Sequence, residues 1–587
     1  MNLKKVLFSA LMLTATGAAV AVTEPENNVL MGGVISGRVV DAEHQALPGA
    51  TIMVEDLHTG VTSDVNGFYT LPNMKPGTYK VKVSYVGYSP KTYVIKLVGK
   101  NVERNIILSE GNELKEVVVN GAFYGQRKAL QMQKENMGVT NVVSADQVGK
   151  FPDSNIGDAL KRINGINVQY DQGEARFGQV RGTSADLTSV TVNGNRMPSA
   201  EGDTRNVQLD LIPADMIQTI EVNKVVTSDM DGDAIGGEIN LVTKNTPSHQ
   251  VLNFNVGSGY TWISGKPQWD LAATWGNRFF QNRLGIMASA SYQYAPGGSD
   301  NTEFEYEEND DKEIELKEAQ VRQYYVTRER QSYSLALDYK FNPLHKISFK
   351  GIYNRRSDWE NRYRISYKKL NSKASKQSVV LQTKAGSSDQ KNARLELQQT
   401  MDYTLDGEHQ LGNLKMDWAA SYSRATEERP NERYASYKYK YGKSETEFID
   451  FGDGFQDVGD KQPYYAKSLP SLDDSHWVLD ELNNSNQDIV ENEWKGRLNF
   501  TLPLCKGLYG NTLKFGAKYT SKNKKRTTSF FDYDPEEVLG DDWRSNTSLQ
   551  IRNGFMPGSQ YPANSPFISI STLGKIDFSQ YEVTENY

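Results

Sequence analysis

Between residues 284 and 519 the chain repeatedly alternates apolar and polar side chains, in segments joined pairwise by short turns. Segment 333–341 carries an apolar or aromatic residue at every second position, and segment 347–353 resumes the pattern after the turn 342–345. The pattern recurs in 284–294, 395–403, 414–422, 494–504 and 513–519. Because successive side chains of a β-strand point to opposite faces, these segments are predicted strands with one apolar face. A soluble β-sandwich and a membrane β-barrel would both show this alternation.

The connectors between the segments distinguish these two folds. The turn 342–345 and the connectors after Asp406-Gly407 and after 504 are short, whereas 296–328, 355–390, 425–490 and 521 onward are long, charged and rich in Tyr. Bacterial outer-membrane barrels alternate short periplasmic turns with long outer loops. Residues 251–587 are therefore predicted to be the N-terminal part of an antiparallel transmembrane β-barrel, with 342–345 in the periplasm. About a dozen strands fit this length, so we expect a truncated barrel.

The N-terminus has the features of a secretory signal. Lys4 and Lys5 precede an apolar stretch, and Ala19-Val20-Ala21 is a small-residue cleavage site, so 1–21 is the predicted signal peptide. Cys505 is the only cysteine in the sequence, which excludes a disulfide within the chain. The net charge of −7 argues against a nucleic-acid-binding protein.

Residues 34–108 contain six strand-like runs separated by short turns, which predicts a β-sandwich. The segment resembles the carboxypeptidase-regulatory-like domain in Gly37-Arg38-Val39-Val40-Asp41, Leu47-Pro48-Gly49-Ala50, Thr62-Ser63-Asp64, Gly67-Phe68-Tyr69, Pro76-Gly77-Thr78-Tyr79 and Gly87-Tyr88. It holds no catalytic constellation, so we expect a structural or interaction module.

Residues 122–247 combine a helix with several strands, and the expected fold of this segment is a small α/β unit. Asp153 or Ser154 is the predicted N-cap of the helix, and Gly165 is predicted to end it. The segment resembles the plug domain of TonB-dependent outer-membrane receptors. The resemblance rests on Asp158-Ala159-Leu160, Gly165-Ile166-Asn167-Val168, Val180-Arg181-Gly182, Val190-Thr191-Val192-Asn193-Gly194, Ile220-Glu221-Val222 and Gly236-Gly237-Glu238-Ile239-Asn240.

Beside the plug, residues 112–121 resemble the TonB box. Val117, Val118 and Val119 form a β-branched run flanked by Glu116 and Asn120. Such a run is either an ordinary edge strand or a template that pairs with another protein's sheet. The resemblance implies docking to TonB with its inner-membrane energising complex, a place in the bacterial outer membrane in contact with its lipid, and a small-molecule or oligosaccharide ligand. A surface lipoprotein is an additional expected partner, and nucleic acid is not.

Several plug residues are candidates for specific roles. Arg181 is expected to be enclosed by the barrel and paired with a wall carboxylate, the alternative being a solvated strand-end arginine. The glycine-rich turns give the other predicted structural residues, Gly182, Asn193, Gly194, Gly236 and Gly237. Polar residues in and beside the loop 197–206 are candidates to face the ligand, namely Arg196, Asp203 and Arg205.

The acidic stretch SDMDGDAIGGEINL, 228–241, raises the alternative of a calcium loop. Counted from Asp229, position 6 is Ala234 and position 12 is Asn240, so the glycine and glutamate of an EF-hand loop are both missing. An acidic turn leading into the last plug strand is the preferred interpretation.

Enzyme motifs do not fit the sequence, and no cofactor is expected. In GYTWISGKP, 259–267, the glycine spacing is one residue too long for a phosphate loop, and H-E-x-x-H, C-x-x-C and G-x-S-x-G do not occur. The predicted fold class is mainly β: an N-terminal sandwich, a small α/β plug and a partial barrel. The predicted function is uptake of a large nutrient, with oligosaccharide favoured. Uptake of a siderophore or metal chelate, a surface adhesin or receptor that does not transport, and a soluble scaffold are the alternatives.

Overall fold

The computed structural model describes residues 33–42, 46–57, 59–64, 66–86, 88–98, 101–109, 129–130, 132–134, 136, 138–144, 155–202, 204–228, 230–247, 249–372, 376–440, 471–504, 512–549 and 566–586. The chain divides into two compact units. The first ends at residue 111, and the second comprises 112–587 together with 47–49. None of the helices in the described ranges has the length and apolar character needed to cross a bilayer.

The first unit contains two four-stranded sheets. One sheet is built from β1 (Gly33–Val40), β4 (Phe68–Met74), β7 (Asn101–Glu103) and β8 (Ile106–Ile107). The other contains β2 (Thr51–Val54), β3 (Thr59–Thr62), β5 (Gly77–Ser84) and β6 (Lys91–Leu97), with the 3-10 turn η1 (Glu55–Leu57) after β2. Apolar side chains of both sheets are buried, among them Ile35, Ile52 and Val81. The predicted sandwich is confirmed.

The second unit begins with the plug, whose centre is a five-stranded mixed sheet in the order β13-β12-β15-β14-β9. The strands are β9 (Thr140–Ser144), β12 (Thr188–Val192), β13 (Asn195–Arg196), β14 (Ile217–Asn223) and β15 (Gly237–Thr243). Strands β12 and β15 are parallel, and the other pairs are antiparallel. A hairpin of β10 (Ile166–Asp171) and β11 (Glu174–Val180) and three 3-10 turns, η2 (Ala185–Leu187), η3 (Leu209–Leu211) and η4 (Ala214–Met216), complete the plug.

The plug helix α4 (Ile156–Leu160) is shorter than the sequence pattern predicts. Its N-cap is Asn155, whose side-chain oxygen accepts a hydrogen bond from the backbone N–H of Asp158 at 3.0 Å. The predicted N-cap at Asp153 or Ser154 is therefore wrong, because an asparagine is available one residue closer to the helix. Gly165 does not end the helix directly; it takes φ +79° in the turn that leads into β10.

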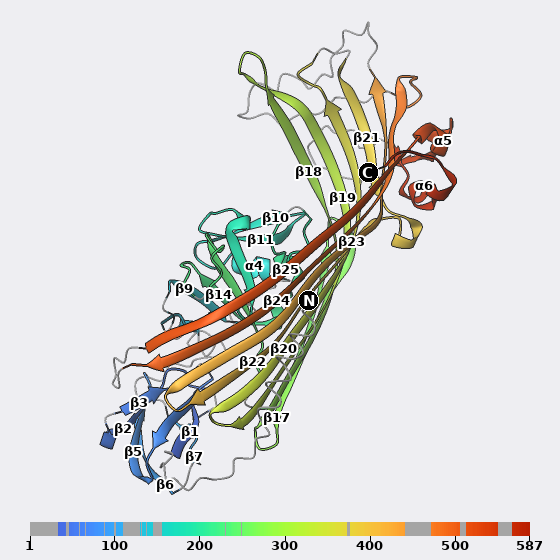
Figure 1. The fold of residues 1–587 in the computed structure, drawn as a ribbon. Helices are drawn as coiled ribbons and strands as arrows, with labels where there is room; N and C mark the ends of the chain where they lie inside the picture. Colours follow the sequence, from blue (N-terminus) through green and yellow to red (C-terminus); the bar gives the residue numbers. More distant parts are fainter. Residues whose placement is uncertain are drawn as a thin grey trace, which may run out of the picture. The chain divides into compact units, whose positions relative to one another are not determined.

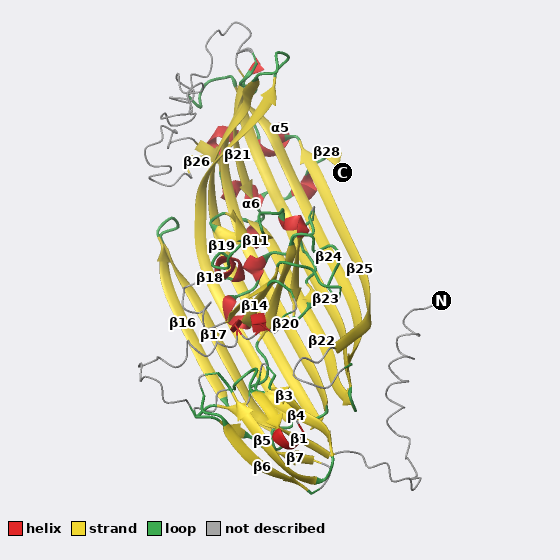
Figure 2. Ribbon diagram, turned by 90° about the vertical axis from the view of Figure 1, so that its left-hand side faces the viewer, coloured by secondary structure: helices red, strands yellow, loops and turns green. Residues whose placement is uncertain are grey.

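The rest of the second unit is an antiparallel sheet of eleven strands, here called the wall (Figure 2). Its strands are β16 (Val251–Thr261), β17 (Lys266–Phe279), β18 (Leu284–Glu308), β19 (Ile314–Asn342), β20 (His345–Lys368), β21 (Ser378–Ala385), β22 (Arg394–Leu411), β23 (Leu414–Lys440), β24 (Trp477–Pro503), β25 (Thr512–Tyr533) and β28 (Val583–Asn586). Strand β22 pairs with one half of β20 and β21 with the other half. In the described residues the sheet does not close between β16 and β25.

The wall strands are much longer than the predicted ones. Strands β18 and β19 have 25 and 29 residues, so most residues of the predicted loops 296–328 and 355–390 belong to strands β18 to β21, which are separated by a turn at 309–313 and a break after Lys368. Their charged and aromatic residues keep the strand alternation, because a strand paired on both sides can carry polar side chains on either face where that face meets water or other protein groups. Asp406-Gly407 lies inside β22, and the actual turn follows at 411–414, where Gly412 has φ +63°.

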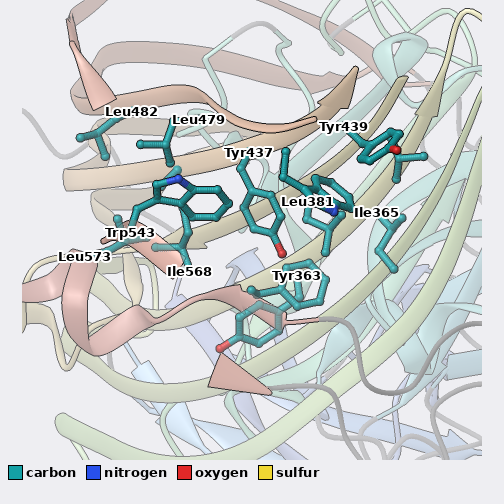
Figure 3. Close-up of a cluster of buried hydrophobic side chains, with 14 of the residues drawn as sticks. Tyr363, Ile365, Leu381, Tyr437, Tyr439, Leu479, Leu482, Trp543, Ile568 and Leu573 are labelled. Carbon is teal, nitrogen blue, oxygen red and sulfur yellow. The ribbon is translucent and has the colours of Figure 1, made fainter. Parts of the chain in front are cut away.

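The segment after β25 also departs from the loop predicted from 521 onward. It contains α5 (Pro535–Leu539), η8 (Trp543–Asn546), β26 (Thr547–Leu549), β27 (Pro566–Ile568), α6 (Ile570–Lys575) and η9 (Phe578–Gln580). These elements pack on the outer halves of the wall strands in an apolar core. Figure 3 shows Trp543, Ile568 and Leu573 of this segment beside Tyr437 and Tyr363 of the wall.

Candidate functional site

The plug lies against one face of the wall (Figure 1), and charged side chains of the two parts form ion pairs across this interface. On β19 and β20, even-numbered residues such as Arg330 and Arg356 contact the plug. Odd-numbered residues point to the other face, where Tyr333 and Tyr353 stack with ring centroids 6.4 Å apart. The period of two in the sequence therefore separates a charged plug side from an aromatic outer side.

Glu174, at the start of β11, forms the first group of contacts. Its carboxylate forms ion pairs with Arg330 and, at 3.0 Å, with Arg328. Burial by itself would raise the pKa of Glu174, but the two guanidinium groups outweigh that effect and lower the pKa to about 2. Glu174 is therefore ionised at neutral pH and holds the β10–β11 hairpin to the wall.

Asp210, in η3, forms the second group. It pairs with Arg356 of β20, and both side chains are only 3% exposed. Arg356 also pairs with Glu396 of β22 at 2.7 Å, and Arg394 pairs with the same carboxylate at 2.8 Å. Because these charges are removed from water, each needs a partner across the interface or along the wall.

Gln172, in the turn between β10 and β11, links two wall strands. Its side-chain amide donates to Glu360 at 2.6 Å and accepts a hydrogen bond from Arg328 at 2.6 Å. Glu360 in turn pairs with Lys384 of β21 at 3.0 Å. The neutral side chain of Gln172 thus lies between the charged wall residues Arg328 and Glu360 and bonds to both.

The loop 197–206 contacts the opposite part of the wall, on β24 and β25. The backbone N–H of Ser199 donates to Glu491 at 3.3 Å, and Lys524 donates to the carbonyls of Glu201 and Thr204. Glu201 also pairs with Arg176 of β11 at 2.5 Å, which joins this loop to the hairpin. Burial would lower the pKa of Arg176, but Glu201 and other carboxylates raise it above its ordinary value. The loop is therefore fixed between hairpin and wall.

The predicted structural residues of the plug lie in tight turns. Asn193 and Gly194 have φ of +53° and +78°, and the N–H of Gly194 donates to Asn240 at 2.9 Å. A Cβ on Gly236 would lie 2.2 Å from the hydroxyl of Thr183, so only glycine fits there. The remaining two, Gly182 and Gly237, have φ of +74° and +141°.

Arg181 does not have the predicted environment. It is exposed, has φ +55°, and donates a hydrogen bond to the carbonyl of Gly236 at 3.3 Å. No ion pair of Arg181 is found among the described residues, so the predicted enclosure and wall carboxylate are wrong. The turn after β11 directs this side chain along the plug surface, and Arg328, Arg330 and Arg356 of the wall are the enclosed arginines instead.

The candidate ligand-facing residues gather around one carboxylate. Arg196 and Arg205 both pair with Asp233, the second at 3.1 Å, and Asp203 lies outside the described residues. Burial would raise the pKa of Asp233, but Arg196 outweighs it and lowers the pKa. Of the two arginines, Arg205 has the more exposed side chain, at 47% against 16%.

The acidic stretch 228–241 is engaged by basic side chains. Asp231 pairs with Lys518 of β25 at 2.6 Å, and Asp233 is shared by the two arginines just named. Within the described residues no group of three or more His, Cys, Asp or Glu side chains could hold a metal ion. The described carboxylates of this turn therefore fix the plug to the wall and to its own loop.

The sequence did not single out Glu174, Asp210, Arg356 or Glu360. Their signal is weak, because a charged residue at every second strand position is also what a water-facing loop or strand contains. The predicted docking residues Glu116, Val117, Val118, Val119 and Asn120 lie outside the described residues.

Comparison with known proteins identifies two domains of the chain. A model of the CarboxypepD_reg-like domain matches residues 35–119, and a model of the TonB-dependent receptor plug domain matches residues 133–238. The chain carries the plug domain of a TonB-dependent receptor and is called the receptor below. The receptor is accordingly an outer-membrane protein.

Among curated proteins, the receptor is similar to TonB-dependent receptor P26 of Formosa agariphila, with 32% identity over 201 residues. The match covers 33% of this chain and 19% of that protein, so the chain spans about a fifth of its relative's length. Among solved structures, matches include the unliganded ferric citrate transporter FecA (13% identity, TM-score 0.30, 71% of this chain and 66% of that chain). The ferric preacinetobactin receptor BauA of Acinetobacter baumannii is another (10% identity, TM-score 0.28, 68% and 61%).

Proposed function

We propose that the receptor takes up a large nutrient across the outer membrane, with energy delivered through TonB. The observation that carries the proposal is the charged interface between plug and wall. The apolar core of the plug includes one wall residue, Ile352, in the described part of the chain, whereas ion pairs at Glu174 and Asp210 join plug and wall directly.

Such an interface suits a plug that must move. When a buried ion pair separates into water, both charges are hydrated again. The net free energy of separating the pair is therefore small compared with the cost of leaving one charge buried without its partner. The plug is thus held in one defined position, yet a pull that opens a water-filled path can replace each protein contact by hydration. An apolar interface of the same size would expose its whole area to water on opening.

The pull would act through residues 112–121, where Val117, Val118 and Val119 add a strand to TonB. Backbone hydrogen bonds would supply most of the affinity in this mode. Glu116 and Asn120 would flank the added strand.

For the ligand, we favour an oligosaccharide over a metal chelate. The sandwich ahead of the plug resembles receptors in which glycan uptake is common, and Phe151-Pro152-Asp153 and Asp231-Gly232-Asp233 resemble an oligosaccharide-linked subfamily. The ligand would meet the loop 197–206 with Arg205 as its most accessible charge. A chelate receptor and a surface adhesin that does not transport are the alternatives.

The test replaces Val118 by proline, which removes a backbone donor from the added strand. We expect loss of co-purification with the C-terminal domain of TonB and loss of growth on the oligosaccharide as sole carbon source. Gln126→Pro, outside the segment 112–121, is the matched control and should bind normally. Unchanged TonB binding by Val118→Pro would refute the docking assignment. Growth dependent on a ferric chelate and independent of the oligosaccharide would refute the choice of ligand.

A further inference from the structure

A cavity of 760 Å³ lies between wall strands β18, β19 and β20, the turn before β22 and the start of α6. It is lined by Tyr294, Tyr325 and Trp359 of these strands and by Lys266 and Lys391. None of these side chains takes part in the plug contacts described above.

Strand alternation places the cavity on the face of the wall opposite to the plug. On β19, Arg330 points to the plug, so Tyr325 points to the same side as the exposed Tyr333. On β20, Arg356 points to the plug, so Trp359 points away from it. The cavity therefore belongs to the lipid-facing side of the wall and not to a path past the plug.

Along the strands, the cavity adjoins a band of exposed aromatic residues. Tyr292 lies two residues before Tyr294 and is 36% exposed, and Trp269, directly opposite Tyr294 in the β17–β18 ladder, is 47% exposed. At the outer end of the β16–β17 hairpin, Tyr260 and Trp262 form an edge-to-face pair with centroids 5.0 Å apart. Aromatic girdles mark the membrane interface of outer-membrane barrels. The cavity thus lies at the depth of the outer-leaflet headgroups.

The chemistry of the lining favours an anion that carries hydroxyl groups. The Nζ of Lys391 lies 3.7 Å from the centroid of the Trp359 ring, so this lysine supplies the positive charge of the cavity. Ser264, Ser571 and Asn361 add hydroxyl and amide groups. Among its described lining residues there is no Asp or Glu. Lysines are common ligands of phosphate, and aromatic faces pack on sugar rings.

We propose that this cavity binds the anionic sugar-phosphate headgroup of an outer-leaflet lipid. Phosphate would meet Lys391, the sugar rings would lie on Tyr294 and Tyr325, and the acyl chains would continue along the aromatic band beside Tyr292. Basic pockets on the surface of membrane proteins bind lipid headgroups in this way. The inference rests on the outer-membrane placement of the receptor and is independent of the nutrient it transports.

The test uses the full chain in detergent micelles, titrated with a bisphosphorylated, acylated glucosamine disaccharide, with bound lipid counted by native mass spectrometry. We expect one retained lipid per chain. Lys391→Gln should weaken binding about tenfold, as expected for loss of one charge-assisted hydrogen bond. Lys391→Arg should keep most of the affinity. Lys391 is exposed, so these variants should fold normally.

The matched control is Lys369→Gln, because Lys369 is also an exposed lysine with a left-handed backbone, φ +58° against +62° for Lys391. It should bind the lipid as the unmodified chain does. Equal binding by Lys391→Gln and the unmodified chain would overturn the assignment of the cavity. Equal affinity for the deacylated bisphosphorylated disaccharide would show a site for a soluble sugar phosphate and overturn the assignment to a lipid.

Discussion

Replacing Glu174 by glutamine tests whether charge pairing holds the plug to the wall. Glutamine keeps the size and the acceptor oxygen of the side chain but removes its negative charge. Arg330 and Arg328 would then lose a shared carboxylate, although Arg328 keeps its pair with Asp358 at 2.8 Å. The Glu174 side chain is 19% exposed and Arg330 is 1% exposed, so water can replace little of the lost interaction.

The size of the effect follows from the pKa of Glu174. Pairing lowers this pKa from 4.5 to about 2, and each pKa unit corresponds to about 1.4 kcal/mol. The ionised form is therefore favoured by about 3 kcal/mol when the hairpin is docked. Because the docked pKa is lowered, this contribution is fully present above pH 4.5 and is lost as the pH falls toward 2.

Hydrogen exchange of the β11 amides in detergent micelles at pH 7 measures the opening of the hairpin. For Glu174→Gln we expect exchange about 300-fold faster, which corresponds to about 3 kcal/mol. Asp171→Asn is the matched control on the same hairpin. Its carboxylate pairs with Arg176 but is 47% exposed, so its loss should change exchange only a fewfold. Equal exchange in Glu174→Gln and in the unmodified chain would refute the electrostatic account of plug docking.

Three further predictions follow from packing, backbone geometry and the acidic turn. Leu573→Ala removes a fully buried side chain from the apolar core beside α6 and should cost about 2–5 kcal/mol, seen as faster trypsin cleavage after Lys575; unchanged cleavage would contradict the packing. Gly194→Val forces a β-branched residue to φ +78° and should cost about 1–2 kcal/mol, seen as a lower urea midpoint, whereas an equal midpoint would contradict the turn geometry. Because Asp231 is already paired with Lys518, millimolar calcium should leave the thermal midpoint unchanged; a rise that Asp231→Ala abolishes would restore the calcium alternative.

The sequence predicts the strands of the wall better than their ends. Alternation located both strands of the hairpin at 342–345, and the ladder pairs Asn342 with His345 as expected. It did not show where strands stop, because residues beyond the membrane are polar on both faces whether they form a strand or a loop. Only backbone pairing with a neighbouring strand decides between the two, and that pairing depends on segments far apart in the sequence.

For single residues of the site, too, local features could be predicted from the sequence and contacts between distant segments could not. The predicted turn at Asn193 and Gly194 is local, since a left-handed pair is favoured by those two residue types themselves. The partner of Arg181 was not local. The environment of Arg181 depends on the contact between the turn after β11 and Gly236, and a contact between segments this far apart cannot be predicted from the local sequence.

The strand register determines which side chains face the plug and which face the opposite side of the wall. On β20, Arg356 serves the plug and Trp359 lines the outer cavity, so the same alternation supplies charge to one face and aromatic groups to the other. A slip of one residue would exchange the faces, placing Arg356 toward lipid and leaving Asp210 buried without its partner. The short turn at 342–345 and the buried ion pairs therefore fix the same register. Because the register is fixed, the charged residues of the wall always face the plug, and they are not exposed on the lipid-facing surface, where charged side chains are destabilising.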